Sequence, residues 1–209
     1  MTTHEHPHRT AGFRRPSARS NQTSPEFTPA EAVHTGTRAA RAYVFGSVRL
    51  LIGFVFLWAF LDKAFGLGYA TPSGKGWIEG GSPTAGFLGH VAVGPMESTF
   101  HSWAGDSWAD WLFMLGLLGI GLALAAGVAL RFAAVAGTVM MALMWIAEWP
   151  PARHLSDGSP SMSTNPFADY HLVYAAVLIT LAAVSAGDAL GLGRSWARLS
   201  TVRAHPWLR

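Results

Sequence analysis

The sequence predicts an all-α protein, an integral membrane four-helix bundle with a long outer loop between its first two helices and a disordered N-terminal tail. Half of its 209 residues are apolar and only 13% are charged, with a mean hydropathy of +0.26, which is too apolar for an ordinary soluble domain. Four apolar runs of roughly 15 to 20 residues approach the length that crosses a hydrocarbon core of ~30 Å. These runs lack strict apolar–polar alternation, which favours helices over the strands of a membrane barrel.

The pattern divides the chain into three parts. Residues 1–40 are predicted to be a disordered cytoplasmic tail, because they are rich in Ser, Thr, Pro, His and Arg and show no apolar periodicity. Residues 41–193 form the membrane domain, and residues 194–209 form a basic cytoplasmic tail. The predicted spans are Tyr43–Leu61, Trp111–Leu130, Phe132–Ala147 and Leu172–Ala186.

The distribution of basic residues predicts the orientation. Twelve of the 15 Lys and Arg residues lie in the N-terminal stretch, the link between the second and third runs, or the C-terminal stretch. The other side keeps Lys63, Lys75 and Arg153 with most of the acidic residues, so the positive-inside rule places both termini in the cytoplasm and the loops 63–109 and 149–169 outside. We interpret the basic residues as topology signals of a plasma-membrane protein in contact with lipid, and expect no nucleic-acid partner.

Small residues and a long loop supply two further expectations. Gly119, Ala123 and Gly127 recur at four-residue spacing, which favours close helix packing inside the bundle over a dimer face, although both remain open. A structureless stretch as long as 63–109 is uncommon in a compact protein. We therefore expect this loop to form a cap over the bundle.

Ionisable residues gather at the predicted outer helix ends. They are Asp62, Lys63, Asp110, Glu148, Asp169 and His171. Charges inside a membrane are costly, so we expect a wet pocket or pairing of Lys63 with Glu148 or Asp62. The alternatives are that Asp110 and Asp169 cap helix N-termini, that His171 bonds a loop carbonyl, and that Arg49 anchors the first helix at the cytoplasmic interface.

The third run also carries a group of polarizable side chains that suits a flat ligand. Met140, Met141, Met144, Trp145 and Glu148 share helical spacing, for which core packing is the default interpretation. A quinone ring would find suitable aromatic and thioether partners there. The predicted quinone-binding residues are Phe56, Trp58, Phe60, Met144, Trp145 and Trp149.

Four segments resemble the DoxX/DoxD family of small four-helix membrane proteins. They are RLLIGFVFLWAFLDKAFG at 49–66, GWIEGGSPTAGFLG at 76–89, WPPARH at 149–154 and MSTNPFADYHLVYA at 162–175, and the resemblance extends from about Arg49 to Trp196. It implies a bacterial plasma-membrane subunit related to thiosulfate:quinone oxidoreductase, which passes electrons from thiosulfate to a quinone of the respiratory chain. Other relatives are similar to scaffolds of membrane redox complexes.

Two functional hypotheses follow. In the first, an outer pocket binds quinone, Lys63, Glu148 and His171 are catalytic, Lys63 and Arg153 attract an anionic substrate, and partner redox subunits deliver electrons. In the second, the chain is a non-catalytic assembly subunit. The chain has no Cys, no flavin or nicotinamide fingerprint and no transmembrane His pair, so we expect no haem, flavin or metal.

Overall fold

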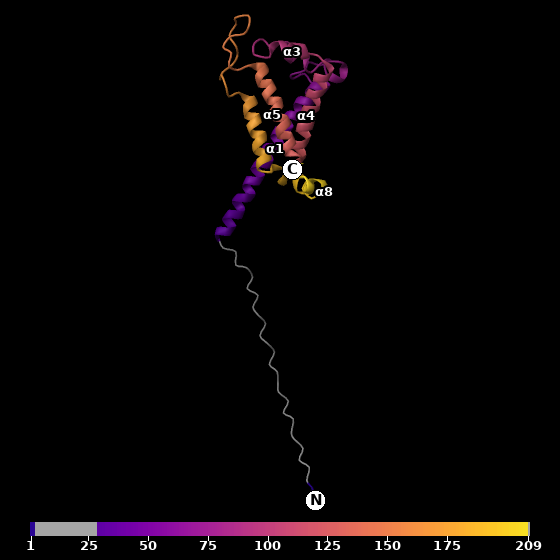
Figure 1. Cartoon of the computed structure of the whole chain (residues 1–209), viewed down its shortest axis with the longest axis vertical. Coiled ribbons are helices and arrows are strands. Elements are labelled where there is room, and N and C mark those ends of the chain that lie inside the picture. Colours follow the sequence, from indigo (N-terminus) through magenta and orange to yellow (C-terminus); the bar gives the residue numbers. More distant parts are fainter. Residues whose placement is uncertain (3–28, 209) are drawn as a thin grey trace.

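All regular structure that the computed structural model describes is helical. The described residues are 1–2 and 29–208, with side chains described from residue 36 onward, so the predicted tail at 3–28 lies outside them. Three helices are long and apolar enough to cross a membrane, namely α1 (Pro29–Phe65), α4 (Ser107–Ala126) and α5 (Leu130–Glu148). A shorter apolar helix, α6 (Tyr170–Ala183), packs beside them (Figure 1). The all-α prediction is confirmed.

The four apolar helices pack in a fixed order. α4 packs against α1 and α5, and α5 packs against α6. Close approach depends on glycines, since a Cβ at Gly121 would lie 2.7 Å from the Leu57 side chain and one at Gly53 would lie 3.0 Å from the Ala125 nitrogen. A Cβ at Gly119 would meet nothing within 4 Å. Of the other two residues of the predicted stripe, Ala123 packs against the main core, and a Cβ at Gly127 would lie 2.9 Å from Gly187. Two of the three stripe residues therefore serve packing inside the protein.

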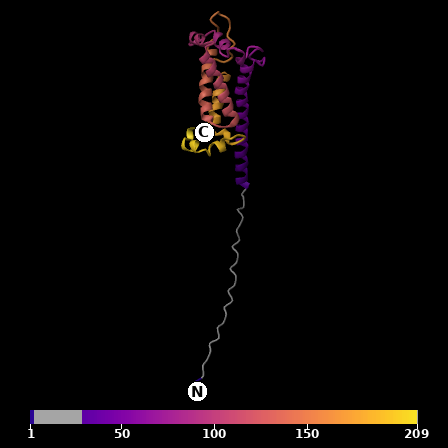
Figure 2. The ribbon, with the colours of Figure 1, turned by 90° about the vertical axis from the view of Figure 1, so that its right-hand side faces the viewer.

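Several helix boundaries differ from the predicted spans, and two of these differences have a clear physical reason. α1 begins at Pro29 and not in the forties, because proline is favoured at a first helical position and the following stretch is rich in Ala, the best helix former. α4 ends at Ala126 because Gly127 turns the chain with φ of 73°, which glycine adopts readily. Figure 2 shows α1 running along the bundle and extending past its end.

Residues 66–106 form a cap across one end of the bundle, which we call the cap end. The cap contains the short helices η1 (Trp77–Glu79), α2 (Ala85–Gly89) and α3 (Glu97–Trp103). Val91 and Phe100 of the cap are buried against Ala147 near the end of α5.

Two buried carboxylates hold the cap. Asp62 accepts hydrogen bonds from the Tyr69 and Thr71 amides at 3.2 and 2.8 Å. Asp110 accepts bonds from the Ser82 hydroxyl at 2.9 Å and from the Thr84 amide and hydroxyl at 2.9 and 2.6 Å. The N-cap position of α4 is Asp106, so the expectation that Asp110 caps this helix is wrong.

The opposite end, which we call the tail end, is organised around Arg49. It contains η2 (Ala186–Asp188), α7 (Gly193–Trp196), α8 (Ser200–Ala204) and η3 (Pro206–Leu208). The Arg49 side chain is 0% exposed and donates to the carbonyls of Leu124, Ala125, Ala186, Ala189 and Leu190. The interfacial anchoring predicted for Arg49 is wrong, because the guanidinium lies inside the protein. It joins the carboxyl end of α4, where the helix dipole favours a cation, to the segment 186–190 that follows α6.

Candidate functional site

The strongest site candidate lies at the cap end between α5 and α6. Glu148 is the last residue of α5, and Asp169 is the N-cap of α6, immediately before Tyr170 and His171. The chain leaves α5 at Trp149, which has a φ of 38°, and prolines at 150 and 151 prevent the helix from continuing. The loop at 149–169 then returns to α6, which brings these four side chains together.

Asp169 fixes both the helix and the histidine. One carboxylate oxygen accepts a bond from the Leu172 amide at 3.2 Å, so the prediction that Asp169 caps α6 is confirmed. The other oxygen lies 2.8 Å from His171 Nδ1. Since an ionised carboxylate only accepts hydrogen bonds, Nδ1 carries a proton and donates it to Asp169, and Nε2 is the ring nitrogen left for another partner.

The free side of the imidazole faces a cavity. His171 is 1% exposed, and Nε2 has no hydrogen-bond partner among the described residues; the same holds for the buried Thr138 hydroxyl. Both side chains line one cavity of about 310 Å³. Its lining comprises Thr138, Met141, Ala142, Trp145, Ile146, Phe167, His171, Leu172 and Ala175. Since buried polar atoms are nearly always bonded, the two unpartnered atoms indicate a place for a bound polar molecule, either an ordered water or a ligand.

Tyr170 and Glu148 continue the polar cluster toward the surface. The Tyr170 hydroxyl donates to Glu148 Oε1 at 2.6 Å, and the other Glu148 oxygen lies 4.0 Å from His171 Nδ1. The Glu148 side chain is 37% exposed, and the Tyr170 ring packs on the imidazole with centroids 4.0 Å apart. A proton on the buried imidazole therefore has a nearby acceptor in contact with solvent.

The returning loop is held over the cavity by its own hydrogen bonds. The Trp145 indole donates to the Phe167 carbonyl at 3.0 Å. Farther out, the Ser159 hydroxyl donates to Asp157 at 2.6 Å, which lowers the pKa of that exposed carboxyl. These bonds fix the turn of the loop and the position of Phe167.

The same acidic cluster has the composition of a metal site. Ligand atoms of Glu148, Asp169 and His171 all lie within 4.8 Å of one another, and imidazole with carboxylates suits several divalent metals. The sequence predicts no metal, and Nδ1 is already hydrogen-bonded to Asp169 in this arrangement. A metal at this place would have to displace that bond.

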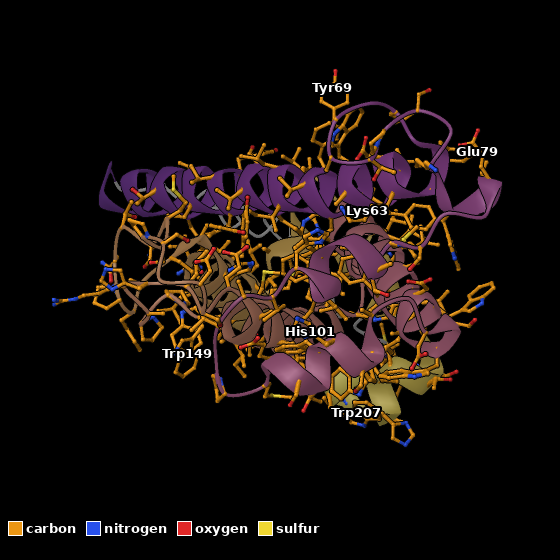
Figure 3. All side chains as sticks on the ribbon, turned by 90° about the horizontal axis from the view of Figure 1, so that it is seen from above. Lys63, Tyr69, Glu79, His101, Trp149 and Trp207 are labelled. Carbon is orange, nitrogen blue, oxygen red and sulfur yellow. The ribbon has the colours of Figure 1, made fainter. Side chains whose placement is uncertain are left out.

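Lys63 is not part of this cluster. It is half-buried on α1, and among the described residues it forms no ion pair with Glu148. The expected pairing with Asp62 is retained only as an electrostatic interaction with the neighbouring carboxylate, without a direct salt bridge. Figure 3 shows Lys63 well apart from Trp149, which follows Glu148. Arg153 is exposed in the returning loop.

The residues predicted to bind the quinone do not lie together in the structure. Phe56 and Phe60 belong to the main core, and Trp58 packs against Phe54 and Tyr69. Of the predicted quinone-binding residues, Trp145 alone lines the cavity beside His171. The Trp149 ring packs on the Trp145 ring with centroids 5.5 Å apart.

Met144 lines a separate cavity of about 350 Å³ between α4, α5 and the cap. Trp103, Trp108 and Phe113 also line it.

Sequence reasoning missed three residues of the site, namely Thr138, Phe167 and Tyr170. One signal was present for Thr138, because it is the one polar side chain in the run 132–147. Tyr170 gave no such signal, since a tyrosine at a helix end is equally typical of a membrane interface. The sequence matches no protein-family model, and neither a curated protein nor a solved structure matches it.

Proposed function

We propose that the chain is an integral membrane subunit of a quinone-linked oxidoreductase, with its quinone pocket between α5 and α6 beside His171. The observation that carries this proposal is the pair of unpartnered buried atoms, His171 Nε2 and the Thr138 hydroxyl, in one otherwise apolar cavity. The resemblance of the sequence to the DoxX/DoxD family points to the same ligand.

The membrane part of the proposal rests on the helices. α1, α4 and α5 are each long enough to cross a bilayer, and much of their outward surface is apolar, including Leu51, Leu112 and Val135, which are 63, 65 and 68% exposed. Such a surface is unfavourable in water and favourable in lipid. α6 has 14 residues and completes the fourth crossing with its flanking residues. Both termini lie in the cytoplasm and the cap end faces outward, as the positive-inside rule predicts.

The cavity suits the head group of a quinone. Its volume of about 310 Å³ is at the lower end of the range of ligand pockets, and Trp145 and Phe167 offer flat faces for a ring. A quinone has oxygens on opposite sides of its ring, and the Thr138 hydroxyl and the His171 imidazole supply polar partners for them. A bound quinone supplies a two-electron, two-proton redox couple.

The residues around His171 then have distinct roles. Asp169 holds the imidazole so that Nε2 faces the ligand and stabilises the imidazolium when Nε2 takes a proton. The imidazolium then releases its other proton, on Nδ1, to Glu148, which lies 4.0 Å from Nδ1 and exchanges that proton with water. Partner redox subunits deliver the electrons, and Lys63 and Arg153 attract an anionic electron donor such as thiosulfate.

Quinone content after purification in mild detergent tests the pocket. We expect about one quinone per wild-type chain, and about 5- to 150-fold weaker retention in His171→Ala and Thr138→Val, because a lost bond that leaves its partner buried costs about 1–3 kcal/mol. Thr180→Val and His90→Ala are matched controls, because the Thr180 hydroxyl bonds the Ala176 carbonyl and His90 is exposed in the cap.

Two results would overturn the proposal of a quinone pocket. Wild-type protein without quinone but with a stable protein partner would favour the assembly subunit. Stoichiometric metal that disappears in His171→Ala would assign the cluster to metal binding.

The topology has its own test, because the chain contains no Cys. Ser73→Cys and Ser200→Cys place single thiols at exposed positions in the cap and the tail end. We expect a membrane-impermeant maleimide to label Ser73→Cys on intact cells and to label Ser200→Cys only after lysis. The reverse pattern would invert the proposed orientation.

A further inference from the structure

A basic crevice lies at the tail end, far from the His171 cavity. The N-terminal part of α1 and the segment 184–194 enclose a volume of about 810 Å³. Three arginines reach it from two separate parts of the chain, Arg38 and Arg41 from α1 and Arg194 from α7, and Asp188 is the one acidic residue among its lining residues. This accumulation of positive charge favours an anion.

The two α1 arginines are available to a ligand. Both are exposed, and neither forms a hydrogen bond or ion pair with any residue of the described chain. Arg194 is held in place, since its Nε donates to the Asp188 carbonyl at 2.9 Å. Guanidinium groups bind phosphate through parallel hydrogen bonds, so Arg38 and Arg41 are well suited to a phosphate group.

The remaining walls of the crevice are apolar. Tyr43, Phe45, Val184 and Leu190 line it. Farther along α1, Val44 and Leu51 are 60 and 63% exposed and continue this apolar surface toward the bundle. A ligand with a phosphate at one end and hydrocarbon at the other matches both parts.

The crevice also lies at a suitable depth. Arg49 joins the carboxyl end of α4 to the segment 186–190 that follows α6, and this junction marks the tail-end limit of the bundle. Arg41 precedes it by eight residues, about 12 Å along the helix axis at ~1.5 Å per residue. This distance places Arg41 at the level of phospholipid head groups when the apolar helices span the bilayer.

We propose that this crevice binds the phosphate of an anionic phospholipid such as phosphatidylglycerol, with the acyl chains against α1. The proposal rests on the membrane part of the proposed function and not on quinone binding. Zwitterionic lipids carry a compensating ammonium group, so three arginines favour the anionic head group over them.

Lipid binding to the purified full-length chain tests the proposal. Native mass spectrometry in a mild detergent would compare added phosphatidylglycerol with phosphatidylcholine of the same acyl chains. We expect wild type to prefer phosphatidylglycerol, and Arg38→Gln/Arg41→Gln to bind it about 30-fold more weakly, which corresponds to about 2 kcal/mol at 1.4 kcal/mol per tenfold and about 1 kcal/mol per arginine. Arg198→Gln/Arg203→Gln is the matched control, because these exposed tail-end arginines lie outside the crevice.

A second measurement locates the lipid and separates it from a free anion. Photoactivatable phosphatidylglycerol should crosslink to peptides covering 38–45 and 184–194, and inorganic phosphate at millimolar concentration should not displace it. Equal binding by the two double variants, or no preference over phosphatidylcholine, would overturn the proposal. Displacement by inorganic phosphate would assign the crevice to a free anion. Quinone content in the same samples should stay unchanged, so failure of the lipid site and failure of the quinone site are distinguishable.

Discussion

Arg49 offers the most direct test of how this fold is held together. It is a fully buried cation whose described partners are backbone carbonyls at the carboxyl end of α4 and in the segment 186–190 that follows α6. Because the acceptors belong to the backbone, no second substitution can remove them. Arg49→Met keeps the length and apolar stem of the side chain but leaves the carbonyls without this donor.

The structure sets the expected size of the effect. Four of the five hydrogen bonds from Arg49 are 3.2 Å or shorter. At the low end of about 1 kcal/mol for each acceptor left unsatisfied, Arg49→Met lowers the free energy of unfolding by about 4 kcal/mol, a large share of the ~5–15 kcal/mol typical of proteins. Arg49→Lys retains the charge but lacks the planar fork that reaches both segments, and we expect it to lose about 2 kcal/mol.

The assay is equilibrium unfolding in mixed micelles, followed by the fluorescence of the nine tryptophans. Arg198→Met is the control, because Arg198 is exposed and surface substitutions usually change stability by less than about 0.5 kcal/mol. A free energy of unfolding for Arg49→Met within 1 kcal/mol of wild type would refute the reasoning, as would an equal loss in the control.

Three other substitutions test the packing. Asp110→Ala removes three hydrogen bonds to the cap, and we expect amide hydrogen exchange in 82–90 to become at least about tenfold faster; unchanged exchange would contradict the role of Asp110. Gly187→Ala places a methyl group against the Gly127 carbonyl, so we expect loss of folded protein in a detergent-solubility assay. Gly119→Ala, which meets open space, should leave stability unchanged or raise it by up to about 1 kcal/mol in the unfolding assay.

Hydropathy predicted the helices better than their ends. The apolar residues from Val128 to Leu130 extend the second predicted span, yet the chain turns at Gly127. Hydropathy averages over many residues and does not register a single glycine at a positive φ. The early start of α1 was missed for a related reason. The first residues of this helix are too polar to raise the hydropathy, although their alanines strongly favour helix.

The site was predictable only where it depends on neighbours in the chain. Asp169 and His171 lie two residues apart and remain together at the start of α6. Lys63 required knowledge of which helices are neighbours, and α1 packs mainly against α4 and only slightly against α6. The sequence does not show which helices are neighbours, so all the outer helix ends were predicted to lie together. For that reason Lys63 was predicted to lie beside Glu148.

Hydrogen-bond satisfaction distinguishes the two kinds of buried polar group in this protein. Arg49, Asp62 and Asp110 are buried charged residues, and each is bonded to backbone or loop groups that it holds in place. His171 is equally buried, but its Nε2 and the hydroxyl of Thr138 have no partner among the described residues. An unpaired buried polar atom costs about 1–3 kcal/mol, and a ligand bonded to both atoms would recover that free energy. The first group therefore serves the fold, and the second lies where we propose that the ligand binds.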